Sequence, residues 1–439
     1  MLFPARLAWR VLIRVATILV LPVSAMVWLM HLLRYVSDIR RSDVVVLMTN
    51  PPAFAHTIVG PDVARRMFKG RRCLFLVTFW KFGFNPLVSE IWPDINVRFI
   101  RRFVLAVQFR HRVTSIPFAQ LHDRMAQWVT RKVVLLFGHK DGRFFSLEEL
   151  YEELLSQESL ARNVTADHSG WSPPMRLAAA QIILQQRVPA PNIHLPKHML
   201  EEISGKLARI WRSSGNEEEA KYCCLYLRYE EKDSYTTRLR NTSNIQNHLP
   251  AVSLLNGQGY QVLLTGDLGL DVETRDAFKG RLVDAESLGV EAGVFNLFAA
   301  LEADIFIGNN GGGVCLPNIN DIPVLFLDAF PFNFGYKNSF VYFKSARDKK
   351  GCVIPGLRLI SDFAADITAT FGALENNSAA EITEAVASFI DDLKALDGPD
   401  PHADIAEMIP VNSLFRITGA RISPAWIRHN VVVTDEMAS

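Results

Sequence analysis

Residues 304–317 read DIFIGNNGGGVCLP, and this order of residue types decides the fold. Asp304–Gly308 is a short apolar run typical of a strand, and Val314–Asn318 begins a helical pattern after a glycine loop. Glycines without a Cβ let backbone N–H groups approach a phosphate or ribose, and the following helix would present its positive end. Alternatively, the glycines permit a tight turn with positive φ. The segment predicts a strand–loop–helix unit, whose candidate ligand-binding residues are Asn309, Asn310, Gly311, Gly312 and Gly313.

The flanking segments alternate between apolar runs and helical patterns, which is typical of βαβ units and a mostly parallel sheet. Downstream, we expect strands at Tyr222–Arg228, Gln261–Thr265 and Pro323–Asp328, and helices at Asn244–Asn256, Phe295–Glu302 and Ala379–Leu396. Upstream, we expect strands at Asp43–Thr49, Arg72–Phe79, Asn96–Ile100 and Lys132–Phe137, and helices at Phe118–Thr130, Leu147–Leu155, Pro173–Gln186 and Lys197–Ser213. The pattern predicts an α/β protein with two Rossmann-like, doubly wound domains.

Changes in composition predict the domain boundaries. Residues 1–41 form a hydrophobic segment, residues 42–215 a first Rossmann-like domain and residues 216–411 a second. The boundary between the two lies at the Ser214-Gly215-Asn216 turn and the acidic run after it. Residues 412–439 have mixed signals, and we expect them to pack back across the domain junction.

Charge is divided unequally along the chain. Of 439 residues 49% are hydrophobic, which excludes disordered and fibrous classes. The net charge of +1 is an average, because residues 1–145 contain 22 Lys and Arg against 7 Asp and Glu, whereas the remainder contains 25 against 39. The basic part is suited to an anionic partner. No nucleic-acid recognition fold is visible, so anionic lipid is the simpler partner. The five cysteines form no metal or disulfide pattern, and we expect no metal or other cofactor.

The N-terminal segment is expected to meet a membrane. Val15–Leu33 carries no formal charge over 19 residues, about the length of a spanning helix. Arg6, Arg10 and Arg14 recur every four residues before it, which gives a cationic helical face suited to anionic headgroups. Pro22 lies near the middle of the apolar run. Three alternatives stay open: a single-span anchor, a helix–break–helix that dips into one leaflet, and a helix packed on a partner protein.

Several polar residues follow the predicted strands of the second domain. Arg228 ends the first strand of this domain, where its planar guanidinium is suited to a diphosphate. Arg238, Arg240 and Asn241 precede the next helix in a loop that could close over a ligand. Gly266 and Asp267 end the following strand, where a carboxylate could hold a sugar hydroxyl. Ion pairing of Arg228 with nearby glutamates and a solvated charge patch are the alternative interpretations.

The first domain contains possible proton acceptors at positions that we expect to be loops. The main candidates for a catalytic base are His56, Asp62 and Asp141. His139, Asp167 and His168 are further histidines and aspartates of the same kind, and each could instead be only a turn former. Basic clusters around Arg65 and Arg66, and around Arg98 and Arg110, surround the early strands.

Two stretches resemble a family of bacterial glycosyltransferases linked to surface-polysaccharide clusters. They are CLYLRYEEKDSYTTRLRNTSNIQNHLPAVSLLNGQGYQVLLTGD at 224–267 and FIGNNGGGVCLPNINDIPVLFLD at 306–328. Weaker likeness extends to HTIVGPD at 56–62, to Asn85-Pro86-Leu87 and to ARISPAWI at 420–427. The resemblance implies a GT-B fold that is distantly similar to that of fucosyltransferase-like enzymes. In the family the first strand ends in His-x-Arg and a serine adjoins the loop glycine. Here Tyr226 replaces that histidine and asparagines precede the glycines.

The resemblance implies a glycosyltransferase, and together with the N-terminal segment and the division of charge it predicts a membrane-associated, metal-independent enzyme at the cytoplasmic face of a bacterial inner membrane. Its expected substrates are a nucleotide-sugar, held by Arg228 and the glycine loop, and a lipid-linked glycan or glycolipid acceptor at the first domain. A DxD-type metal motif is absent from the sequence. The alternative is a noncatalytic subunit that keeps this fold as a scaffold and binds a protein partner through residues 1–41. A third reading is a nucleotide-dependent enzyme of another doubly wound type.

Overall fold

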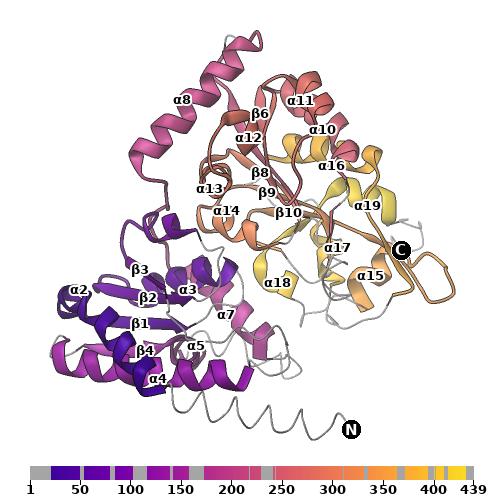
Figure 1. Ribbon diagram of the computed structural model, residues 1–439. Helices are drawn as coiled ribbons and strands as arrows, with labels where there is room; N and C mark the ends of the chain where they lie inside the picture. The colour runs from indigo at the N-terminus through magenta and orange to yellow at the C-terminus, as the bar shows by residue number, and fades with distance from the viewer. Residues whose placement is uncertain are drawn as a thin grey trace, which may run out of the picture. The chain divides into compact units, whose positions relative to one another are not determined.

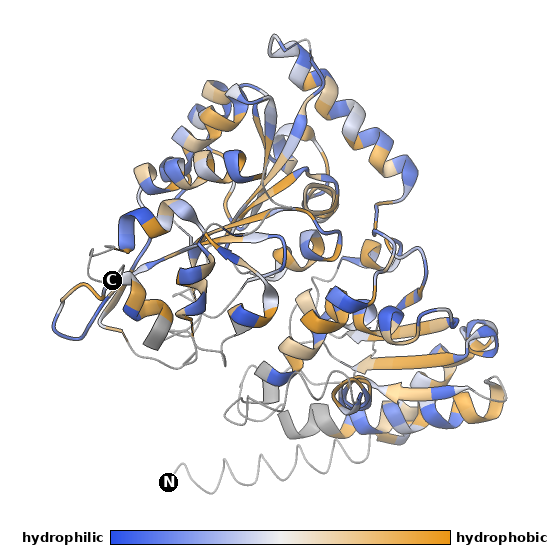
Figure 2. Cartoon of the chain, turned by 180° about the vertical axis from the view of Figure 1, so that it is seen from behind, coloured by the Kyte–Doolittle hydropathy of each residue, from blue (hydrophilic) through white to orange (hydrophobic). Residues whose placement is uncertain are grey.

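A computed structural model shows two compact units, Met1–Ser156 (unit 1) and Gln157–Ser439 (unit 2), each built around a parallel sheet (Figure 1). The described residues are 21–49, 54–79, 85–101, 116–138, 142–157, 173–216, 218–228, 241–242, 244–309, 311–330, 335–362, 371–393, 400, 402–409 and 414–431. In both units the strands are hydrophobic, as their colours in Figure 2 show. This arrangement agrees with the expected α/β class.

Unit 1 contains a four-stranded parallel sheet of order β3-β2-β1-β4. Its central strand β1 has the sequence VVVLMT and is buried on both faces, which is why the sequence shows a continuous apolar run rather than an alternation. The elements of the unit are α2 (Val36–Arg41), β1 (Val44–Thr49), α3 (Phe54–Met67), β2 (Cys73–Phe79), η1 (Pro86–Ser89), β3 (Asn96–Arg101), α4 (Ile116–Phe137), β4 (Arg143–Ser146) and α5 (Leu147–Ser156).

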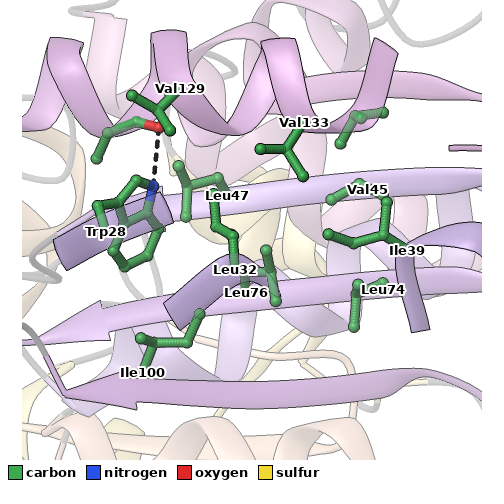
Figure 3. Close-up of a cluster of buried hydrophobic side chains, with 12 residues drawn as sticks. Trp28, Leu32, Ile39, Val45, Leu47, Leu74, Leu76, Ile100, Val129 and Val133 are labelled. Carbon is green, nitrogen blue, oxygen red and sulfur yellow. Dashed lines mark hydrogen bonds between the residues drawn. The ribbon is translucent and has the colours of Figure 1, made fainter. Parts of the chain in front are cut away.

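Helices cover both faces of this sheet. On one face, Gly60 of α3 lies close to Phe75, Met48 and Leu147, and a Cβ on Gly60 would lie 2.9 Å from the Phe75 ring. The other face is covered by α4, α2 and the helical residues 21–33, hereafter helix 21–33. The buried side chains of this second face form one cluster, shown in Figure 3: Trp28, Leu32, Ile39, Val45, Leu47, Leu74, Leu76, Ile100, Ala126, Val129, Val133 and Val134.

Helix 21–33 is the C-terminal part of the run that the sequence predicts as a membrane anchor. Trp28 and Leu32 are buried in the core of unit 1, and the Trp28 indole Nε1–H donates to the Ala126 carbonyl (3.2 Å) and to the Thr130 hydroxyl (3.0 Å). Within the described residues, no helix combines the length and the apolar character needed to cross a bilayer. The spanning anchor of the expected fold is therefore unsupported, and residues 1–20 lie outside the described part.

The segment Lys132–Phe137 is not a strand, contrary to the expectation from its β-branched residues. It forms the last turns of α4, because Val133 and Val134 continue the buried stripe of Ala126 and Val129 at helical spacing. The place beside β1 is taken by β4, whose Arg143 pairs in register with Val44. The local β-propensity is overridden by packing on the sheet.

Unit 2 contains a seven-stranded parallel sheet of order β13-β10-β9-β8-β5-β6-β7. In chain order, the first elements of unit 2 are α7 (Pro173–Arg187), α8 (Lys197–Ser213), β5 (Lys221–Leu227), α10 (Ile245–Gly257), β6 (Tyr260–Gly266), α11 (Val272–Phe278), β7 (Leu282–Val283), α12 (Ala285–Leu288) and α13 (Ala292–Glu302). They are followed by β8 (Ile305–Gly308), η2 (Gly312–Val314), α14 (Cys315–Ile319), β9 (Val324–Ala329), β10 (Ser339–Phe343), β11 (Ser345–Arg347), α15 (Gly356–Asp362), β12 (Ala373–Glu375), α16 (Ala379–Asp392), α17 (Ala403–Glu407), α18 (Leu414–Thr418), β13 (Arg421–Ile422) and α19 (Pro424–Asn430).

The division between the units falls at Ser156, earlier than the expected boundary at residue 215. The reason is that α7, α8 and the segment between them pack on the second sheet's own elements. The Asn320 side chain exchanges hydrogen bonds with the backbone of Ile193, and the Gln186 amide donates to the carbonyl of Thr418.

The described part of the C-terminal tail packs on elements of unit 2, where α18 contacts α7, a helix that the sequence assigned to the first domain. Strand β13 extends the sheet beside β10, and α19 packs on α16.

Candidate functional site

The polar residues of unit 2 gather at the carboxyl ends of its parallel strands. Numbered from β5, the seven strands lie in the order 3-2-1-4-5-6-7, so the direction of winding changes between β5 and β8. The register pairs Leu227 with Gly266 and Tyr226 with Gly308. Arg228 and Asn309 therefore emerge on either side of this switch point, and Asp267 emerges beside Arg228. Ligands of open α/β sheets bind at this position.

Gly266 is required by the close pairing of β5 and β6. Its φ is +101°, and a Cβ there would lie 2.1 Å from the Leu227 carbonyl oxygen. The backbone N–H of Asp267 donates to that same oxygen (2.9 Å), which fixes the end of β6. The Asp267 carboxylate follows as an exposed group that could accept hydrogen bonds from sugar hydroxyls.

The glycine loop packs on the ring of Tyr226. A Cβ on Gly311 would lie 2.6 Å from the Tyr226 ring, and one on Gly313 would lie 3.1 Å from it. Gly311 has φ −89°, and neither Gly312 nor Gly313 is among the glycines with positive φ. The alternative interpretation, a tight turn with positive φ, is therefore wrong for these three glycines. These glycines are needed because an aromatic side chain of β5 occupies the space beneath them.

The helical segment behind the loop is short. Gly312–Val314 form one turn of 3₁₀ helix and α14 has five residues, Cys315–Ile319. The expected positive helix end is consequently weaker than the sequence suggested, since the macrodipole depends on many aligned peptide units. Asn310 lies outside the described residues, whereas Asn309 is fully buried at the end of β8. Charge at this edge comes from side chains rather than from the helix.

A second group of buried polar residues lies at the ends of β9 and β10, and sequence reasoning did not identify it as a cluster. Asp328 has φ 50° and no exposed surface, and its carboxylate accepts from the Asn377 N–H (2.5 Å) while its own N–H donates to Asn377 Oδ1 (2.6 Å). Lys344, which follows β10, is also buried. Its ammonium donates to the Asn241 carbonyl (2.6 Å) and to Asn376 Oδ1 (2.5 Å).

In this cluster, burial and the charge of Asp328 shift the pKa values of the basic side chains in opposite directions. Burial lowers the pKa of Lys344, and the negative charge of Asp328 acts in the opposite direction. Burial likewise lowers the pKa of His248 on α10, against the Asn244 carbonyl that its Nδ1 contacts at 3.0 Å and the charge of Asp328. Aspartate and lysine directly after apolar strand residues were the only sequence signal for this cluster, because its members come from four separate segments.

The loop after β5 is fixed at its base. The N–H and the hydroxyl of Thr242 both donate to the Arg228 carbonyl, at 3.0 and 3.1 Å. Asn241 is thereby held beside Lys344, whereas Arg238 and Arg240 lie outside the described residues. The structure thus brings Arg228, Asn241 and Asp267 to one edge of the sheet and adds Asp328 and Lys344 to them.

The two base candidates of unit 1 that belong to the described residues lie in a helix rather than in loops. His56 and Asp62 both lie in α3. The Asp62 carboxylate is fully buried and accepts from Arg65 Nε (2.8 Å) and Arg66 Nε (3.0 Å). Both arginines are buried too, so they form an internal ion cluster rather than part of a basic surface. Partial burial lowers the pKa of His56 and favours its neutral imidazole.

The remaining base candidates, His139, Asp141, Asp167 and His168, lie outside the described residues. A separate groove of about 570 Å³ lies between the end of α4 and α5, and Leu135, Phe144, Glu149 and Glu152 are among its lining residues. Neither His56 nor Asp62 lines it. No cluster of three or more His, Cys, Asp or Glu suited to a metal ion occurs in the described part of the chain.

Comparisons with known proteins return solved structures alone, since no family model and no curated protein matches the chain. A glycosyl transferase family 9 protein from Veillonella parvula aligns at 9% identity over 69% of this chain and 86% of its own, with a TM-score of 0.38. E. coli ADP-heptose LPS heptosyltransferase II aligns at 12% identity over 80% and 98%, with a TM-score of 0.40. E. coli heptosyltransferase WaaC with ADP-2-deoxy-2-fluoro heptose aligns at 12% identity over 69% and 93%, with a TM-score of 0.36. With each of these TM-scores below 0.5, the architecture rests on the chain's own strand order and register.

Proposed function

We propose that this chain is a membrane-associated glycosyltransferase of GT-B type that moves a sugar from a nucleotide-sugar to a lipid-linked or surface glycan acceptor. Unit 2 binds the donor in this proposal, and unit 1 serves the acceptor. Two parallel α/β units support the architecture, and the sequence resemblance in 224–267 and 306–328 supports the activity. The site of action is the cytoplasmic face of a bacterial inner membrane, where nucleotide-sugars are available.

The observation that carries the proposal is the carboxyl edge of the unit 2 sheet. It places Arg228 beside the switch point of a Rossmann strand order, between Asp267 after one neighbouring strand and Asn309 after the other. A guanidinium can bind both phosphates of a nucleoside diphosphate through parallel N–H donors. An exposed carboxylate such as Asp267 is suited to hydroxyl groups of ribose or sugar. The edge therefore matches the two polar parts of a nucleotide-sugar.

The reaction breaks the bond between the sugar's anomeric carbon and the diphosphate oxygen and forms a bond from that carbon to the acceptor oxygen. The electron pair of the broken bond leaves with the nucleoside diphosphate, whose charge Arg228 stabilises. The acceptor hydroxyl loses its proton to a base. Of the described candidates in unit 1, His56 is better suited than Asp62, because its pKa is lowered by burial whereas Asp62 is held by two arginines.

A thermal-shift screen with UDP-, GDP-, CMP- and ADP-sugars, followed by calorimetry on the best ligand, tests the proposal. Arg228→Ala should weaken donor binding by about tenfold or more, since it removes a charge-assisted contact to phosphate. Arg281→Ala is the matched control, because Arg281 is an exposed arginine beside the amino end of β7 in the same sheet. Equal donor affinity in the wild type and Arg228→Ala would refute the role of Arg228.

One observation favours a noncatalytic scaffold as the second candidate. Tyr226 stands where the resembled family has histidine, and its ring lies against Gly311 and Gly313 at the switch point. A scaffold would give no thermal shift with any of the four nucleotide-sugar classes. It would also purify as a stoichiometric complex with another protein.

A further inference from the structure

Two neighbouring helices of unit 1 leave large apolar side chains exposed. On helix 21–33 the exposed residues are Val23, Met26, Leu29, Met30 and Leu33. On α4 they are Leu121, Trp128, Leu135 and Leu136, of which Trp128 is 63% and Leu135 70% exposed. Leu121, Trp128 and Leu135 recur every seven residues and so form one stripe along the helix. These nine residues are called the apolar helical face below.

Both helices cover the same side of the sheet. Trp28 of helix 21–33 and Val129 and Val133 of α4 contact one core cluster, together with alternate residues of β1 and β2 (Figure 3). Alternate residues of a strand point to one side of a sheet. The opposite faces of the two helices, which carry the exposed residues, therefore both point away from that side. The apolar helical face is one surface layer rather than two separate patches.

Exposed Arg and Lys side chains border the apolar helical face. Exposed Arg124 and Lys132 flank the α4 stripe, and exposed Arg34, Arg40 and Arg41 follow helix 21–33. Helix 21–33 contains no acidic residue, and α4 contains Asp123 as its only one. An exposed apolar surface bordered by Lys and Arg is typical of helices that lie in the headgroup region of an anionic bilayer. On the α5 side of the face, Leu135 shares a groove with Glu149 and Glu152, so the positive charge borders the surface at Arg124, Lys132 and the arginines after helix 21–33.

We propose that the apolar helical face is the surface by which unit 1 rests on an anionic bilayer, with α4 inserted to headgroup depth beside helix 21–33. This proposal rests on the membrane association in the proposed function and names a surface for it that includes an internal helix. Trp128 is its central residue, because an indole ring is favoured at a membrane–water interface. Trp28 on the opposite side of the layer belongs to the protein core. The sequence alone placed membrane contact in residues 1–41.

Co-sedimentation of the full chain with vesicles tests this surface. The probes are phosphatidylcholine vesicles with and without phosphatidylglycerol, and the variant is the double substitution Trp128→Glu and Leu135→Glu. We expect about a tenfold or greater loss of binding to the anionic vesicles, because two charged groups replace apolar side chains. Val272→Glu is the control, since Val272 is 70% exposed on α11 of unit 2. Unchanged sedimentation of the double variant overturns the proposal.

Additional measurements separate the other outcomes. Circular dichroism and thermal unfolding should show that the double variant is folded. Light scattering in the absence of lipid reports on a second copy as occupant: a wild-type dimer that the double variant abolishes would contradict the membrane assignment. Full binding by the α4 variant, with binding lost on replacing Arg6, Arg10 and Arg14 by Gln, would leave the proposed membrane association intact and refute only the α4 surface. The nucleotide-sugar thermal shift should be the same in all these variants.

Discussion

The sheets of the two units begin with the same strand order but use their polar and apolar residues differently. Numbered from its first strand, each sheet is arranged 3-2-1-4, and unit 2 adds three more strands. In unit 1 the described buried charges are paired internally: Asp62 pairs with Arg65 and Arg66 within α3, and Arg65 also pairs with Asp94. In unit 2, Arg228, Asp328 and Lys344 stand at the carboxyl edge of the sheet. Unit 1 instead exposes apolar side chains on its outer helices.

This difference indicates that a shared strand order does not decide function. The order places strand ends together, but the residues at those ends decide whether the edge can bind a ligand. Unit 2 has the polar edge that we propose as the donor site, and unit 1 has the apolar helical face that we propose as the membrane contact. The following substitutions test this contrast.

The largest loss of stability is expected for Asp62→Ala. It leaves the guanidinium groups of Arg65 and Arg66 buried with their shared carboxylate removed, and breaking a buried ion pair costs about 3–5 kcal/mol. Urea unfolding of the full chain measures the change. Asp43→Ala is the comparison, because its ion pair with Arg72 is exposed and should contribute at most about 1 kcal/mol. Similar losses for both variants would show that the α3 cluster is not a structural ion network.

Two tryptophans of unit 1 provide the next test. Trp28 is 2% exposed and Trp128 is 63% exposed, although both lie in the helical layer. Trp28→Ala should reduce the free energy of unfolding by about 3–5 kcal/mol, as truncation of a core aromatic does. Trp128→Ala should change it by no more than about 0.5 kcal/mol. The reverse order in denaturant unfolding would contradict the assignment of the two helix faces.

The glycine loop of unit 2 should tolerate a methyl group poorly. Gly311→Ala places a Cβ 2.6 Å from the Tyr226 ring, and overpacking of this kind costs about 1–3 kcal/mol. Adding Tyr226→Ala should remove that cost, which thermal unfolding of the single and double variants can measure. If Gly311→Ala also abolishes donor binding, and the double variant regains stability but not binding, the loop also contacts the donor. If neither stability nor binding is affected by Gly311→Ala, the packing account is wrong.

The smallest effect expected is a pH dependence from His248. Burial lowers its pKa in the folded state below the ordinary value of 6.5, so the unfolded chain binds the proton more readily. Its contribution to stability is therefore complete above about pH 6.5 and is lost as the pH falls below that value. His248→Gln should flatten the decline of Tm between about pH 7 and 5. His198→Gln, at an exposed position on α8, should leave that decline unchanged.

Much of the fold could be predicted from local patterns. The helix at Lys197–Ser213 has the bounds that the sequence predicts, and β1, β2 and β8 begin within one residue of them. These elements succeed because a continuous apolar run or a regular helical stripe is encoded in consecutive residues. Lys132–Phe137 fails because its residues satisfy either pattern, and only the place already taken by β4 excludes the strand.

The candidate site was predicted only in part. Arg228 and Asp267 follow apolar strands, and this position alone is enough to propose them. Asp328, Lys344 and Asn377 could not be grouped from sequence, since they meet only when the ends of β9 and β10 are brought beside the segment before α16. Tyr226 looked like an ordinary strand residue until its ring was seen beneath the glycines.

The sequence by itself determined the α/β class, most strands and helices, the basic first part and the arginine at the switch point, because each is a property of consecutive residues. The tertiary structure alone decided which neighbours those residues have. It divided an apolar N-terminal run into a core face around Trp28 and an outer face around Met30, and it showed that the glycine loop packs on Tyr226. The physical reason is that burial and contact depend on segments far apart in the chain, whose positions no local periodicity contains.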